Sequence, residues 1–126
     1  MFQSGTTGSP KGAIIKHTGI INACNLFNKL PFGHAGWGRR CIPIPLFHVF
    51  GLGTGLVCPL MTSETAVFPF YFPDTMSIIK STETYKCENI MGPPTILIDF
   101  LNHPERSKYD LSSLNKILMV NNNNFF

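Results

Sequence analysis

A nine-residue loop near the start of the chain combines the residue types that bind phosphate. It reads Ser4-Gly5-Thr6-Thr7-Gly8-Ser9-Pro10-Lys11-Gly12. Glycine lets the backbone approach a ligand closely, and the serine and threonine hydroxyl groups can donate hydrogen bonds to phosphate oxygens. Successive backbone N–H groups in such a loop can bind an anion, and the ammonium group of Lys11 adds positive charge. The loop is therefore predicted to hold the phosphates of a nucleotide.

This loop differs from the Walker loop, whose pattern is G-x-x-x-x-G-K-[ST]. The residue five positions after Gly5 is Pro10, and Lys11 is followed by Gly12, which has no hydroxyl group for magnesium. An unrelated P-loop NTPase is therefore the weakest interpretation. A flexible surface loop rich in serine, threonine and glycine is the structural alternative, and the closing Pro-Lys-Gly makes it less favoured.

The segment from Phe2 to Gly12 resembles the phosphate-binding signature of the adenylate-forming enzymes, the superfamily of acyl-CoA synthetases and luciferase-like enzymes. The family pattern is an aromatic residue and Thr, then Ser-Gly-Thr-Thr-Gly-x-Pro-Lys-Gly, and this chain has Gln3 in place of that Thr. By this resemblance, Ser4 to Gly12 hold the β- and γ-phosphates of ATP, and Lys11 neutralises their charge. Magnesium would bridge the phosphates. Its carboxylate ligand in the family has no counterpart here, so no metal ligand is assigned.

Two later segments resemble the same superfamily. Pro45 to Gly51 reads Pro-Leu-Phe-His-Val-Phe-Gly and is similar to the family motif Pro-x-[Phe/Tyr]-His-x-x-Gly, which lies near the acyl pocket. The resemblance implies that His48 helps to gate the carboxylate substrate, with Phe47 and Phe50 beside it. From its residue type alone, a single His among apolar residues is more often a hydrogen-bonded core residue. Gly92 to Leu101 resembles the family segment in which a strand ends in x-Pro-Thr and a helix follows.

The resemblance covers nearly all of residues 2–120 and is closest to the medium-chain fatty-acyl-CoA synthetases. It implies a reaction in two steps. The carboxylate of a fatty acid attacks the α-phosphorus of ATP, giving acyl-adenylate and pyrophosphate, and the thiol of coenzyme A then displaces AMP. The implied cofactors are ATP, magnesium and coenzyme A, and the implied substrate is a medium-chain fatty acid. The enzymes resembled work in mitochondria or cytosol, but the sequence assigns neither a compartment nor an oligomeric state.

The later motifs of the superfamily do not occur in these 126 residues. They bind adenine, magnesium and ribose and supply the catalytic lysine, so no catalytic residue is assigned. We expect residues 1–120 to be an incomplete piece of the large N-terminal AMP-binding (adenylation) domain of a fatty acid–CoA ligase, inactive alone. Residues 121–126 are expected to be a low-complexity tail without similarity. The alternative is a nucleotide-binding or interaction-only remnant without catalysis.

Composition favours a buried piece of a larger fold. Apolar residues make up 44% and charged residues 13% of the chain, against about 25% charged in an average domain. The net charge of +3 is too small and too scattered to indicate nucleic acid, and the densest basic spot, Arg39-Arg40, is expected to be a solvated pair. The cysteines and histidines show no metal-ligand spacing. We therefore expect reduced, mostly buried thiols at Cys24, Cys41, Cys58 and Cys87.

The most apolar stretch, residues 42–61, has nearly the length that spans a bilayer, which is about 20 residues. Pro43, Pro45, His48 and Pro59 argue against a continuous transmembrane helix. A strand, a turn and a buried helix explain this stretch better, so no transmembrane span is predicted.

The chain as a whole reads as alternating strands and helices, which predicts an α/β fold with a mainly parallel sheet and flanking helices. The phosphate loop is expected at the end of a strand of that sheet. Leu97, Ile98, Phe100 and Leu101 are expected to bury the inner face of the last helix. Strands are predicted at 1–3, 13–15, 39–44, 65–69, 89–91 and 116–120, and helices at 18–30, 49–60, 75–85 (capped by Asp74) and from 93 onward.

Overall fold

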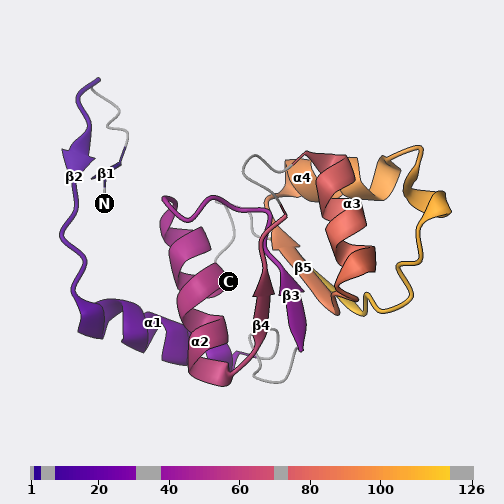
Figure 1. Ribbon diagram of the computed structural model, residues 1–126. Coiled ribbons are helices and arrows are strands. Elements are labelled where there is room, and N and C mark those ends of the chain that lie inside the picture. The colour runs from indigo at the N-terminus through magenta and orange to yellow at the C-terminus, as the bar shows by residue number, and fades with distance from the viewer. Residues whose placement is uncertain (1, 4–7, 31–37, 70–73, 120–126) are drawn as a thin grey trace.

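The computed structural model describes residues 2–3, 8–30, 38–69 and 74–119 (Figure 1). The predicted α/β fold is confirmed, because a four-stranded parallel sheet is flanked by helices. In chain order the elements are β1 (Phe2–Gln3), β2 (Lys11–Gly12), α1 (His17–Lys29), β3 (Arg39–Cys41), the π-helix η1 (Gly51–Val57), α2 (Cys58–Thr62), β4 (Thr65–Val67), α3 (Thr75–Thr84), β5 (Asn89–Gly92), α4 (Pro94–Asn102), the 3-10 helix η2 (Arg106–Lys108) and β6 (Lys116–Met119).

The parallel sheet has the strand order β4-β3-β5-β6. Parallel neighbours need a crossover connection, and a helix supplies it each time: α2 before β4, α3 before β5 and α4 before β6. In Figure 1, α1 and α2 lie on one side of the strands, and α3 and α4 lie on the other. The predicted tail and the boundary at residue 120 fall outside the described residues, so they stay predictions.

The hydrophobic core lies between the sheet and the pair α3 and α4. The strands of the sheet contribute short apolar side chains to this core, and α3 and α4 each contribute one buried face. The buried members of this cluster are Cys41, Val67, Ile78, Ile79, Cys87, Ile90, Leu97 and Phe100. All four cysteines are buried and free, as predicted. No helix among the described residues is long and apolar enough to cross a membrane.

Local signals explain where α3 and α4 begin. The Asp74 carboxylate accepts a hydrogen bond of 2.8 Å from the backbone N–H of Ser77, which confirms the predicted N-cap. Pro94 stands in the first turn of α4, where the missing N–H costs no helical bond.

The buried face of α4 is narrower than predicted. Leu97 and Phe100 are fully buried, whereas Ile98 and Leu101 are 50% and 43% exposed. The prediction that all four side chains are buried is therefore wrong. A helix lying on a sheet buries only a stripe of its surface, and these four residues span more than that stripe.

The strand predicted at 13–15 is also misplaced. The chain pairs two residues earlier, with Phe2 opposite Gly12 and Gln3 opposite Lys11. Residues 13–16 have no regular structure, and Ile14 is 95% exposed. Among the described residues, the pairing of β1 with β2 ends at Phe2 and Gly12.

Candidate functional site

The described part of the phosphate loop lies on a small antiparallel ribbon. β1 pairs with β2 in a two-stranded sheet separate from the parallel sheet (Figure 1). The expectation that the loop follows a strand of the parallel sheet is therefore wrong, because the hairpin partner of β1 comes from the loop's own far end. Of the predicted binding residues, Ser4, Gly5, Thr6 and Thr7 lie outside the described residues.

The remaining loop residues are open to solvent. Gly8 has φ of +92°, a conformation that side-chain-bearing residues rarely adopt. All residues from Gly8 to Gly12 are exposed, including Lys11 on β2. The described half of the loop therefore presents its backbone and one ammonium group to solvent, where an anionic ligand has free access.

The aromatic motif forms a tight turn that leads into a helix. The His48 backbone N–H donates to Pro45 O at 3.0 Å, and the Phe50 backbone N–H donates to Nδ1 of His48 at 3.2 Å. Since Nδ1 accepts this bond, the neutral ring carries its proton on Nε2. His48 is exposed, as is Phe47 at 82%, and Phe50 is half-buried. His48 is therefore not a core histidine, and its Nε2–H is available as a donor.

The helix after this turn is a π-helix, which the sequence did not predict. The predicted helix at 49–60 is present, but Gly51–Val57 has the wide i→i+5 pattern before α2 continues it. A side chain at Gly51 would place its Cβ 2.2 Å from Pro45 O, and one at Gly55 would place its Cβ 2.6 Å from Cγ2 of Ile42. The glycines therefore let the helix pack directly against the backbone that enters the aromatic motif.

Arg40 lies beneath this helix and is fully buried. Its Nη1 donates to Thr54 O at 3.2 Å, and its Nη2 donates to the carboxylate of Glu64 at 2.5 Å. The expectation of a solvated Arg39-Arg40 pair is wrong for Arg40. Successive side chains of a strand point to opposite faces, so Arg39 is exposed while Arg40 points into the protein. Nothing in the sequence pairs Arg40 with Glu64, which follows it by 24 positions.

The electrostatics of this buried cluster keep its groups in defined protonation states. Burial lowers the pKa of Arg40, and the charge of Glu64 opposes that shift. The guanidinium still stays protonated, since arginine does not lose its proton in proteins. Burial, with contact to the Cys24 thiol, raises the pKa of Cys58 to about 12, so this thiol is neutral at physiological pH. The cluster is thus a buried ion pair beside the neutral thiol of Cys58.

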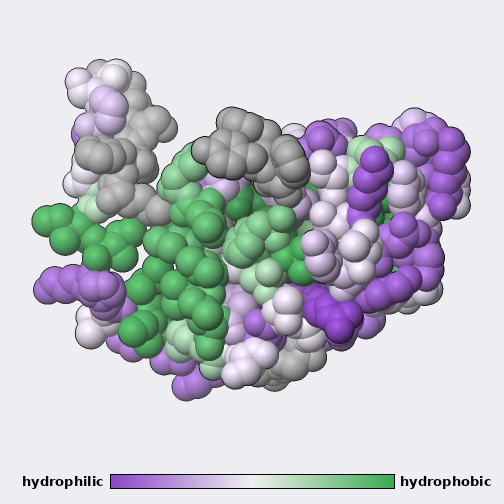
Figure 2. Space-filling view, in the orientation of Figure 1, coloured by the Kyte–Doolittle hydropathy of each residue, from purple (hydrophilic) through white to green (hydrophobic). Residues whose placement is uncertain are grey.

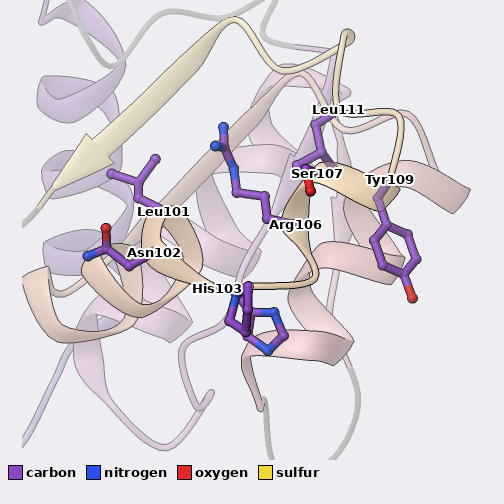
Figure 3. A pocket seen from close by; sticks show the side chains of 8 residues that line it. Leu101, Asn102, His103, Arg106, Ser107, Tyr109 and Leu111 are labelled. Carbon is purple, nitrogen blue, oxygen red and sulfur yellow. The ribbon is translucent and has the colours of Figure 1, made fainter.

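A surface pocket lies elsewhere, at the C-terminal end of α4 (Figure 3). It has a volume of about 320 Å³ and is formed by the end of α4, by η2 and by the segment that follows. Polar side chains such as His103 and Arg106 line it together with Leu101 and Leu111. None of the predicted site residues lines this pocket. No group of three or more His, Cys, Asp or Glu in the part of the chain that the structure describes is placed to hold a metal.

The chain matches known proteins over most of its length. The family of AMP-binding enzymes matches residues 1–123. The chain is 38% identical over 116 residues to the mitochondrial medium-chain acyl-CoA ligase ACSF2 of Danio rerio. This match covers 90% of the chain and 19% of that protein. It is 36% identical over 120 residues to the putative acyl-CoA synthetase YngI of Bacillus subtilis, covering 94% of the chain and 21% of YngI.

Solved structures share the fold. The O-succinylbenzoate coenzyme A synthetase MenE of Bacillus subtilis, in complex with ATP and magnesium, superposes with a TM-score of 0.76 at 26% identity. That match covers 94% of this chain and 24% of MenE. The chain thus spans about a fifth of the length of the sequence relatives named above.

Proposed function

The chain belongs to the family of AMP-binding enzymes, and from this premise we propose that it is part of a ligase that activates a fatty acid with ATP and transfers it to coenzyme A. The observation that carries the proposal is that the match runs through residues 1–123 and contains both the phosphate loop and the aromatic motif. The sequence relatives bear the names medium-chain acyl-CoA ligase and putative acyl-CoA synthetase, which favours a medium-chain fatty acid as the substrate class.

The proposed chemistry overcomes the poor reactivity of a carboxylate, whose leaving group would be oxide. Attack of the carboxylate on the α-phosphorus of ATP converts that oxygen into part of an AMP leaving group and releases pyrophosphate. The thiol of coenzyme A then displaces AMP to form a thioester. Such a reaction needs no covalent nucleophile from the protein, so its catalysis depends on positioning the reactants and on stabilising charge that develops on the phosphates.

In this scheme the loop from Ser4 to Gly12 holds the β- and γ-phosphates, and Lys11 balances their charge. Magnesium, when bound, would screen the phosphate charge further. The exposed ammonium of Lys11 and the positive φ of Gly8 support this role, because both suit a backbone that wraps an anion.

At the fatty-acid site, His48 is proposed to donate its Nε2–H to the carboxylate of the fatty acid. The bond from Phe50 N–H to Nδ1 supports this assignment, since it fixes the tautomer that donates at Nε2. Phe47 and Phe50 would contact the hydrocarbon chain. Phe47 supports this role because an aromatic side chain that is 82% exposed has apolar surface to cover.

The first test measures the binding of ATP with magnesium to the full chain by calorimetry. We expect Lys11→Ala to weaken binding about tenfold, as the loss of one charge-assisted contact would. Lys16→Ala is the matched control, because Lys16 is exposed just beyond the loop and is expected to leave the affinity unchanged. Equal affinities for the two variants would refute the phosphate role of the loop.

The second test is release of pyrophosphate from ATP, magnesium and octanoate. We expect none above the blank, since the chain spans only about a fifth of the length of its sequence relatives. Release that depends on octanoate and disappears in Lys11→Ala would show that the chain is active alone.

An interaction-only remnant is the second candidate function. The exposed apolar surface over α2 favours it (Figure 2). Leu60, which lies on α2, is 72% exposed. A chain that binds an apolar dye but neither ATP nor octanoate would support this candidate over the ligase.

A further inference from the structure

Arg40 joins three segments that are far apart in the sequence. It lies on β3, donates to the backbone of η1 at Thr54 and pairs with Glu64 just before β4. The side chains of Arg40 and Glu64 are 0% and 3% exposed. Burial of two charges is costly and is offset only when the geometry is good and further hydrogen bonds are made. The bond from Arg40 to Thr54 O is such a further bond.

The carbonyl that Arg40 holds belongs to the π-helix. Turns of this kind are rare and occur frequently at functional sites. Thr54 makes a second contact, because its hydroxyl donates to Phe50 O at 2.7 Å. Phe50 in turn donates its backbone N–H to Nδ1 of His48. A continuous chain of contacts therefore leads from the buried guanidinium through Thr54 and Phe50 to the His48 ring.

The close packing of η1 leaves this segment little freedom. Gly51 lies against the backbone of Pro45, and Gly55 lies against the side chain of Ile42. Neither position has room for a Cβ atom. The backbone before the aromatic motif and the helix after it are therefore in direct contact. A shift of Thr54 would be transmitted to the turn that carries His48, because densely packed segments move together.

We propose that Arg40 is a positioning residue for the carboxylate site, which it serves by holding Thr54 and thereby the backbone of Phe50 that orients His48. The assignment of that site to a carboxylate rests on the proposed function. Arg40 itself lies under the helix and does not touch the substrate. Its effect on ligand binding is therefore indirect and is exerted through the geometry of the turn.

The test uses the full chain and two readouts, the side-chain ¹⁵N resonance of His48 Nδ1 and the affinity for octanoate. Arg40→Lys keeps the charge but loses the forked geometry that reaches Thr54 and Glu64 together. We expect a shifted Nδ1 resonance and octanoate binding weakened about tenfold, as small misplacements of a site cause. The affinity for ATP with magnesium should stay within about twofold of wild type, since the phosphate loop lies on another sheet.

Arg39→Lys is the matched control. Arg39 precedes Arg40 on the same strand, is exposed and donates to Tyr85 O, so both readouts should match the wild-type chain. A purely structural Arg40 would lower the midpoint of urea unfolding and leave both readouts unchanged in the folded variant, and that result would overturn the proposal. If Arg40→Lys does not fold, Thr54→Val removes the bond to Phe50 O and must shift the His48 resonance.

The two readouts also separate this proposal from the proposed function. If the wild-type chain does not bind octanoate, the carboxylate assignment fails. The His48 resonance of the Arg40 and Arg39 variants then still decides whether Arg40 positions the turn, because that readout needs no ligand.

Discussion

The charged side chains of this protein differ sharply in how much their ion pairs contribute to stability. The pairs Lys86–Asp110 and Lys108–Glu105 lie about half exposed at the surface, where ion pairs contribute little to stability. The pair Arg40–Glu64 is buried, so the loss of one partner would take the opposite charge away from a buried ion. Such a loss costs about 3–5 kcal/mol in other proteins. At the proposed ligand sites, the described residues Lys11, Phe47 and His48 are exposed instead, as contact with substrates requires.

At this scale we predict that acid destabilises the chain through two exposed carboxylates. The pKa of Asp74 is lowered chiefly by its bond from the Ser77 backbone N–H, and the pKa of Asp110 is lowered chiefly by the Lys86 ammonium. Both groups therefore stabilise the folded chain fully above the ordinary aspartate pKa of about 3.9, and they lose that contribution as the pH falls toward their folded values.

The measurement is the midpoint of urea unfolding between about pH 7 and about pH 2.5. In a double variant with Asp74→Asn and Asp110→Asn, we expect the urea midpoint to fall less steeply as the pH is lowered. Asp99→Asn, at an exposed position of α4, is the control and should follow the wild-type curve. A wild-type midpoint that is constant over this range would contradict the prediction.

The elements show which parts of the fold the sequence could predict. α3, β5 and α4 were predicted nearly at their observed positions, because an Asp N-cap, a short apolar run and a proline pair are local signals. The position of β2 and the π-helix were missed, since β2 takes its register from pairing with β1 and η1 packs against Pro45 and Ile42, and no local residue pattern signals these contacts. The burial of Arg40 was missed for the same reason. The proposed site residues were found through a family pattern, and their geometry came only from the structure.

The glycines of η1 give a prediction for this element. Gly55→Ala would place Cβ 2.6 Å from Cγ2 of Ile42, and overpacking of this kind costs about 1–3 kcal/mol of unfolding free energy. Gly19→Ala in α1 is the matched control, because nothing lies within 4 Å of its added Cβ. It should stabilise the chain by up to about 1 kcal/mol through helix propensity. Urea unfolding of both variants checks this, and an unchanged or raised stability of Gly55→Ala would count against close packing of η1.

The described part of the whole molecule has uncovered apolar surface and two outer strands in its parallel sheet. β4 and β6 are the outer strands of the parallel sheet among the described residues. Apolar side chains spread over α2 and the segment before α1 (Figure 2). A soluble domain rarely exposes a large continuous apolar patch, and unpaired edges promote association. The chain is therefore expected to associate or aggregate when it is isolated.

Charge placed on this surface should reduce association. Leu60 is 72% exposed on α2, so Leu60→Lys should lower the binding of an apolar dye and the light scattering of the chain about twofold or more, without loss of stability. Ile98→Lys is the control, because Ile98 is 50% exposed on α4, away from this surface. Equal effects of the two substitutions would show that association has no preferred face.

The strand order also constrains how the chain folds as it is made. β3 pairs with β4 on one side and with β5 on the other. Because β5 ends only at Gly92, one edge of β3 stays unpaired until the ribosome has synthesised the intervening segments. Long-range parallel pairing of this kind is slow and leaves surfaces open to wrong partners. On the ribosome, the nascent polypeptide would therefore depend on chaperones until α4 has emerged and closed the core.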